Sequence, residues 1–186
     1  MPAPLLPKDE VTARITGVFR RHGYEGASLS RLSKETGLGR SSLYHYFPRG
    51  KRDMGEAALA AAGAWIDEHA VAQLDSPGSP HARLARYAAR MAEYYGDGRR
   101  ACLVDLFGIG EAGALFRSQL RRRVKALLGK LAGVAEEAGV APAAAARRAE
   151  DSLMAIQGAL IVSRILGTRA PFRRIIQELP ERLLHG

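Results

Sequence analysis

Apolar residues recur at helical spacing along most of this chain of 186 residues, and this periodicity narrows the possible folds more than any other feature. Val11, Ile15 and Val18 share one helix face near the start, and Leu120 and Val124 begin the same pattern in the second half. Aromatic residues, which favour strands, make up only 6% of the chain, whereas alanine and leucine are abundant. We therefore expect an all-α protein.

Glycine, proline and capping residues divide this periodic sequence into separate helices. Ser28 is a suitable cap for a short second helix, and Gly37 is a suitable end for it. Pro48 and Gly50 interrupt the chain before an alanine-rich stretch that begins at Lys51. The expected helices run over 8–22, 29–36, 40–47, 51–73, 81–95, 99–107, 114–138, 142–166 and 172–184.

Positive charge is concentrated near the start of the chain. Residues 1–54 contain ten Lys and Arg against five Asp and Glu, so they carry more than half of the formal net charge of +9. This imbalance indicates a polyanion-binding module joined to a nearly neutral domain, although an arginine-rich solvated surface would give the same balance. We expect the basic domain at residues 1–50 and a larger helical domain at residues 51–186.

Several functional classes lack support in the sequence. No apolar run approaches the roughly 20 residues of a membrane span, and Met1 to Pro7 lacks the basic and apolar regions of a signal peptide. We therefore expect a cytoplasmic protein with no membrane partner. One cysteine, five scattered histidines and the lack of a catalytic motif predict no metal site, no cofactor and no enzyme activity.

One glycine pattern resembles a nucleotide-binding loop. The run from Gly108 to Gly113 reads G-x-G-x-x-G and follows a short apolar stretch. Such a loop binds a dinucleotide between a strand and a helix of a parallel sheet, whereas the surrounding sequence has helical periods. A glycine junction between two helices is the better interpretation.

The recognition segment, residues 28–54, combines residue types that suit a DNA duplex. A short helix, a glycine turn and a second helix form a helix-turn-helix unit. Free N–H groups at the start of the second helix favour phosphate, and guanidinium and hydroxyl groups can bond base edges in the major groove. We expect Lys51 and Ser28 to contact phosphates on either side. The candidate DNA-contacting residues are Ser28, Arg40, Ser41, Ser42, Tyr44, His45 and Lys51.

The sequence SLSRLSKETGLGRSSLYHYFP, from Ser28 to Pro48, resembles the DNA-binding signature of the TetR family of transcriptional regulators. The final LYHYFP is the strongest part of the likeness, and Gly50-Lys51 before an alanine-rich helix is similar to the subgroup that contains LmrA and YxaF. Gly39 stands where the family often has a Ser or Thr cap, and Ser41 stands where Gly or Ala is frequent. Glycine is itself an acceptable cap.

This resemblance implies a ligand-responsive repressor that binds a palindromic DNA operator as a homodimer. A small hydrophobic organic effector would bind the C-terminal helical domain and release the operator, with the helix from Lys51 connecting the two events. An effector-independent dimeric DNA-binding regulator and a helical enzyme or carrier are the alternatives.

The last two expected helices are apolar over more of their circumference than one short chain would cover. A second copy of the chain is the expected cover, and a fully intramolecular core is the alternative. The expected dimer-interface residues are Leu153, Ile156, Leu160, Ile161, Ile165, Phe172, Ile176 and Leu179.

Larger adaptable side chains gather in the predicted C-terminal domain, where the resemblance implies an effector. Aromatic walls and flexible methionines suit a flat or greasy organic molecule that tyrosine hydroxyls would orient. Core packing also explains each of these residues taken singly. The expected effector-binding residues are Trp65, Tyr87, Met91, Tyr94, Cys102, Phe107 and Met154.

Overall fold

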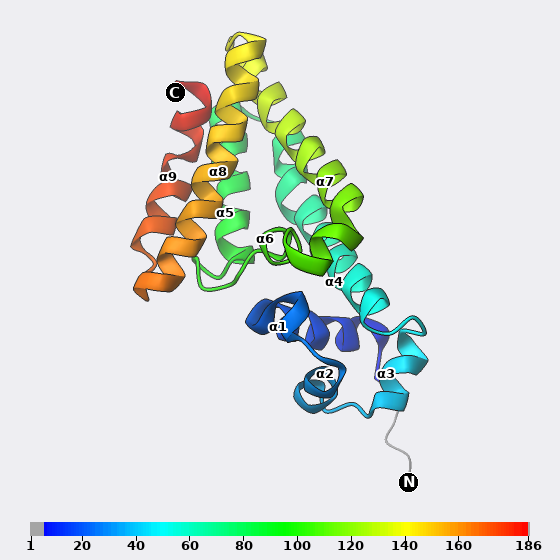
Figure 1. The fold of residues 1–186 in the computed structure, drawn as a ribbon. Helices are drawn as coiled ribbons and strands as arrows, with labels where there is room; N and C mark the ends of the chain where they lie inside the picture. Colours follow the sequence, from blue (N-terminus) through cyan, green and yellow to red (C-terminus); the bar gives the residue numbers. More distant parts are fainter. Residues whose placement is uncertain (1–5, 186) are drawn as a thin grey trace. The chain divides into compact units, whose positions relative to one another are not determined.

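The computed structural model describes residues 6–185, and every regular element in that range is helical, which confirms the all-α expectation. Most of the start of the chain, where we expect no signal peptide, lies outside the described residues. The elements are α1 (Lys8–Gly26), α2 (Leu29–Thr36), α3 (Arg40–Tyr46), α4 (Lys51–Trp65), the π-helical η1 (Ile66–Ala70), the 3-10 helical η2 (Val71–Asp75), α5 (Pro80–Tyr94), α6 (Leu103–Leu106), α7 (Gly110–Glu137), α8 (Pro142–Leu166) and α9 (Ala170–Leu184) (Figure 1).

The chain divides into two compact units. The first contains the described residues up to Ala64 together with Leu103–Arg117, and the second contains Trp65–Cys102 and the described residues from Ser118 onward. The first unit thus includes α6 and the start of α7 in addition to α1, α2, α3 and most of α4. This division follows packing, whereas the expected border at residue 50 follows the end of the sequence motif.

In the first unit, α1 packs against α2, and α2 packs against α3. Val11, Ile15 and Val18 of α1 are fully buried, as the periodicity predicts. Gly23 interrupts α1 with a positive φ of 69°. The predicted limits of the second helix are confirmed, because Ser28 caps α2 and Gly37 ends it in the left-handed conformation.

An aromatic cluster of Phe19, Tyr24, Phe107 and Phe116 joins α1, the residue that follows α6, and α7 within the first unit. The ring centroids of Phe19 and Phe107 lie 5.2 Å apart, and those of Tyr24 and Phe116 lie 5.4 Å apart. α4 passes beside this cluster at Gly55. A Cβ at Gly55 would lie 2.9 Å from a ring carbon of Phe116, so only glycine allows α4 to pack this closely.

In the second unit, α9 lies beside both α8 and α5 (Figure 1). Leu160 of α8 and Phe172 and Leu179 of α9 are buried between these helices. The Ser163 hydroxyl of α8 accepts the Phe172 N–H at 3.1 Å and so caps the first turn of α9.

Three ion pairs join α7 to its neighbours in the second unit. Arg123 Nη2 lies 2.9 Å from Asp67 of η1, and Lys130 Nζ lies 2.7 Å from Asp75 of η2. Glu137, at the end of α7, pairs with Arg83 of α5. The cationic and anionic residues of α7 follow one another at intervals of seven, which places them along one side of the helix.

The expected helix over 51–73 is wrong as one regular α-helix, because α4 ends at Trp65 and the chain continues as π and 3-10 helix. The π turn stacks the Trp65 and His69 rings with centroids 4.7 Å apart. Trp65 also packs on Tyr94, 5.1 Å away between centroids. Tyr94 belongs to α5, so local periodicity does not reveal this second contact.

The expected helix over 99–107 is also wrong, because α6 covers only Leu103–Leu106. Gly96, Asp97 and Gly98 all have positive φ. Because this run is left-handed, α6 begins only at Leu103. Gly98 lies against Phe172, where a Cβ would be 2.8 Å from the Phe172 Cβ. The helix expected from residue 114 instead begins at Gly110, inside the glycine run.

Among the described residues, none of the helices is both long enough and apolar enough to cross a membrane.

We expect Gly55→Ala to lower the free energy of unfolding by about 1–3 kcal/mol, because the added methyl group would overpack the aromatic cluster. Gly129→Ala, in α7, is the matched control, since a Cβ there meets nothing within 4 Å. It should raise stability by up to about 1 kcal/mol through helix propensity. Urea denaturation of both variants measures the difference, and equal effects would contradict this packing.

Candidate nucleic-acid interface

Hydrogen bonds from neighbouring side chains hold the turn between α2 and α3. The Ser33 hydroxyl donates to the Leu38 carbonyl at 2.7 Å. Arg14 of α1 donates through Nη1 to the Thr36 carbonyl at 2.9 Å, at the end of α2. On α3, Leu43 is completely buried and faces the core of the first unit. The turn and the buried leucine together fix which face of α3 points outward.

The outward face of α3 carries the side chains predicted to contact DNA bases. Arg40, Ser41, Tyr44 and His45 are exposed, and Ser42 is half-buried. The Tyr44 ring is 45% exposed and lies beside Gly50, where a Cβ would approach its Cε1 to 3.3 Å. The structure therefore brings these five side chains to one short helix with a polar outer surface.

Ser28 and Lys51, the predicted phosphate contacts, also have partners within the chain. The Ser28 oxygen accepts the Arg31 N–H at 3.2 Å, which leaves the hydroxyl hydrogen for another acceptor. Lys51 Nζ lies 4.3 Å from the centroid of the Tyr24 ring and 3.5 Å from the Glu25 carbonyl oxygen. An ammonium group has three N–H donors, so Lys51 keeps capacity for a phosphate.

Several of the cations in and near the recognition segment are paired with acids. Glu35 pairs with Arg21 at 2.7 Å and with His22 at 2.7 Å, and the hydrogen bond from Arg21 is the main cause of its lowered pKa. Arg49 pairs with Asp53 and Glu56, and the negative charge of Asp53 is the main reason why the pKa of Arg49 is raised. Arg40, by contrast, makes no ion pair with a described residue.

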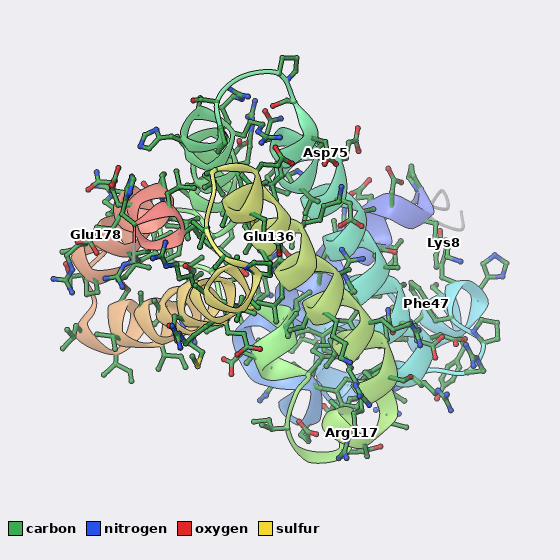
Figure 2. The ribbon with its side chains drawn as sticks, turned by 90° about the horizontal axis from the view of Figure 1, so that it is seen from above. Lys8, Phe47, Asp75, Arg117, Glu136 and Glu178 are labelled. Atoms are coloured by element: carbon green, nitrogen blue, oxygen red, sulfur yellow. The ribbon has the colours of Figure 1, made fainter. Side chains whose placement is uncertain are left out.

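Residues at the start of the described chain contact the end of α3 and the residue after it, and the sequence pattern did not reveal these contacts. The Tyr46 hydroxyl donates to the Leu6 carbonyl at 2.6 Å. Lys8 Nζ lies 5.7 Å from the centroid of the Phe47 ring, and Figure 2 shows these two side chains close together. Both contacts join residues about 40 positions apart in the sequence, and their later partners, Tyr46 and Phe47, lie in the LYHYFP run.

The predicted effector-binding residues are distributed over both units. Phe107 belongs to the aromatic cluster of the first unit, and the other six belong to the second. In the second unit Trp65 packs on Tyr94, and Cys102 Sγ accepts a hydrogen bond from Tyr95 at 3.3 Å. The predicted residues Tyr87, Met91, Tyr94 and Cys102 are buried, whereas Met154 is 62% exposed.

Burial dominates the protonation of the phenols in the second unit. Desolvation, with Cys102 nearby, raises the pKa of Tyr87 and of Tyr95 well above the ordinary value. Both hydroxyls therefore stay protonated at neutral pH and remain hydrogen-bond donors.

The predicted dimer-interface residues fall into two groups. Within the single chain, Ile156, Leu160, Phe172, Ile176 and Leu179 are buried, and Leu153 is half-buried. Ile161 and Ile165 of α8 are 39% and 78% exposed. Met154, Val162 and Leu166, three further apolar residues of α8, are exposed as well. Helical spacing places these exposed residues on adjoining rows of α8.

The Gly108–Gly113 run lies between α6 and the first turn of α7, so a helix rather than a strand precedes it. The geometry that a dinucleotide-binding loop requires is not met. Among the described residues, no three His, Cys, Asp or Glu side chains are grouped to hold a metal ion.

Comparison with known protein families finds a match over the helices that carry the predicted DNA-contacting residues. The family model of bacterial regulatory proteins of the tetR family matches residues 13–58, from α1 into α4. The DNA-binding segment of this chain therefore matches the TetR family. This match contains the whole recognition segment, with every residue predicted to contact DNA.

Two HTH-type transcriptional regulators of Bacillus subtilis (strain 168) are similar in sequence. The uncharacterised HTH-type transcriptional regulator YxaF is 27% identical over 89 residues, which cover 47% of this chain and 46% of YxaF. The HTH-type transcriptional regulator LmrA is 33% identical over 52 residues, 28% of each chain. The chain thus spans less than half the length of the curated relatives it matches.

The TetR fold extends over nearly the whole chain. A TetR regulator from Legionella pneumophila superposes with a TM-score of 0.78 at 16% identity, covering 97% of this chain and 98% of that one. The regulatory protein TetR from Rhodobacter sphaeroides gives 0.77 at 23% identity, covering 93% and 96%. These relatives and structures are transcriptional regulators and not enzymes.

Proposed function

We propose that this chain is a transcriptional repressor that binds a palindromic operator as a homodimer and is released by a small hydrophobic effector. Its target would place it in the bacterial cytoplasm. The observation that carries the proposal is the polar outer face of α3, opposite the buried Leu43 and inside the segment that matches the TetR family.

On DNA, α3 would lie in the major groove as the second helix of a helix-turn-helix unit. Arg40, exposed and without an ion-pair partner among the described residues, is suited to bond a base edge. Ser28 and Lys51, at the starts of α2 and α4, would bond phosphates and fix the orientation of the unit.

The homodimer is supported by the exposed apolar residues of α8. These apolar side chains lie on adjoining rows of the helix, and covering them with a second copy of the chain removes their surface from water, which lowers the free energy. A twofold axis would make the two copies of α8 self-complementary and present two α3 helices about one DNA turn, roughly 34 Å, apart or slightly more. This pairing explains why the operator should be palindromic.

The effector is supported by the aromatic and phenolic groups of the second unit. Trp65, the last residue of α4, contacts His69 and Tyr94, and Tyr87 is buried in α5, the helix that carries Tyr94. An effector that binds the DNA-free conformation more tightly, by about 1–3 kcal/mol, would shift the protein off its operator. An effector-independent regulator would have the same DNA-binding segment and no such response.

Replacing Arg40 and Lys51 separates base recognition from phosphate binding. Arg40→Ala should weaken binding to the preferred DNA site by about 1–3 kcal/mol and reduce the preference for that sequence over others, because a base contact is lost. Lys51→Ala should weaken binding to all DNA sequences alike. It should also reduce the slope of log affinity against log salt concentration by about one unit. Fluorescence anisotropy with labelled duplexes at several salt concentrations measures both. Arg147→Ala, at an exposed site of α8, is the control, and unchanged binding by both test variants would contradict the assignment.

Ile165→Asp and Ile161→Asp should convert the dimer to monomers, because each places an unpaired charge on the apolar face of α8. Ile109→Asp is the matched control, since Ile109 is 67% exposed and lies outside α8. Sedimentation velocity distinguishes the two states. Ile176→Asp is unsuitable, because that side chain is already buried within the chain. Tight dimers in both α8 variants would exclude this interface.

The only tryptophan, Trp65, should report effector binding through its fluorescence. Any compound that lowers operator affinity should also change Trp65 emission, because the ring contacts both His69 and Tyr94. Titration with hydrophobic cations, phenolic compounds and antibiotics, each followed by a DNA-binding measurement, tests this. A compound that releases the operator without changing the emission, with the response intact in Tyr87→Phe, would contradict the site.

A further inference from the structure

Within the first unit, the end of α1 contacts the first turn of α7, although 87 residues separate the two partners. Glu25 Oε1 accepts the N–H of Ala112 at 3.1 Å. The first N–H groups of a helix have no partners inside the helix, and a negative charge there is also favoured by the helix dipole. Glu25 therefore supplies, from α1, a cap for α7.

The glycine pattern of the junction fits this carboxylate closely. Gly110 has a φ of +60°, and a Cβ there would lie 2.6 Å from Glu25 Oε1. At Gly113 a Cβ would lie 2.7 Å from the Gly108 carbonyl oxygen. The G-x-G-x-x-G run thus admits a carboxylate of the same chain and a close turn of its own backbone.

The carboxylate of Glu25 stays ionised at neutral pH. Desolvation by burial is the largest single influence and would raise its pKa, but the backbone N–H groups led by that of Ala112, together with the positive charge of Lys51, outweigh it. The net pKa of Glu25 is lower than the ordinary value. A charged cap on α7 is therefore the normal state of this contact.

Tyr24 and Glu25, in the last turn of α1, also hold Lys51. The ammonium group lies 4.3 Å from the Tyr24 ring centroid, within cation–π range, and 3.5 Å from the Glu25 carbonyl oxygen. A lysine held in this way loses less rotamer freedom when it binds a phosphate than a freely moving one. Tyr24 and Glu25 thus link the start of α4 to the start of α7.

We propose that Tyr24 and Glu25 are positioning residues for Lys51, and that Glu25 connects this phosphate-binding lysine to the first turn of α7. The inference rests on the proposed DNA-binding function. α7 contributes its residues up to Arg117 to the first unit and the rest to the second. A displacement of its first turn would release Glu25 and loosen Lys51, which makes α7 a route of regulation besides α4.

Two variants break the contact from opposite sides. Glu25→Gln removes the charge from the cap, and Gly110→Ala pushes the carboxylate away. Gly139→Ala is the matched control for the second, because Gly139 has a φ of +90° with nothing within 4 Å of a Cβ. Glu93→Gln, at an exposed site in α5, is the control for the first.

Both test variants should bind operator DNA about three- to tenfold more weakly, and the controls should stay within about twofold of the parent. In a Lys51→Ala background the same two changes should have no further effect, since the residue they position is gone. Hydrogen exchange at the Ala112 amide should be faster in both test variants and unchanged in both controls.

If Glu25→Gln and Gly110→Ala lower the DNA affinity further in the Lys51→Ala background, the positioning role is overturned and only a structural role remains. Faster exchange at Ala112 with unchanged DNA affinity would overturn it too, and unchanged exchange would overturn the cap. If Lys51→Ala binds normally while Arg40→Ala does not, the inference is wrong and the proposed function stands. Failure of the parent protein to bind any duplex would overturn both, and the exchange data would still decide whether Glu25 caps α7.

Discussion

The close passage of α4 over the aromatic cluster at Gly55 is the constraint on which the first unit depends. One turn earlier on the same face of α4 is Lys51, and the Tyr24 ring touches both positions. A Cβ at residue 55 would lie 3.1 Å from Tyr24, so any larger residue would lift α4 from the cluster and move the lysine. Core packing and the geometry of the proposed phosphate contact are therefore set by the same ring.

The recognition segment could be predicted from the sequence because local rules determine it. Ser28 and Gly37 limit α2 through caps that need only neighbouring residues, and Leu43 marks the inner face of α3 through simple periodicity. The outward position of Arg40 and Tyr44 follows from the same pattern. For this part of the chain, local sequence and tertiary structure agree.

The features that sequence did not predict depend on distant partners. Glu25 of α1 caps the first turn of α7. α4 ends at Trp65, and the ring of this residue packs on Tyr94 of α5. The apolar circumference of α8 indicates in the sequence that other elements must cover this helix. It does not indicate whether α9 or a second copy of the chain covers each side. The structure divides the predicted interface residues, because α9 already covers Leu160 while Ile165 remains exposed.

Footprinting of the purified protein on the DNA beside its own gene tests the central claim most directly, because it asks whether α3 reads a specific sequence. The account predicts one short protected region containing an inverted repeat, with half-site centres about 10 base pairs apart or slightly more. Protection should disappear when either half-site is changed. Uniform weak protection along the fragment, or none at low salt, would contradict sequence-specific binding by paired helix-turn-helix units.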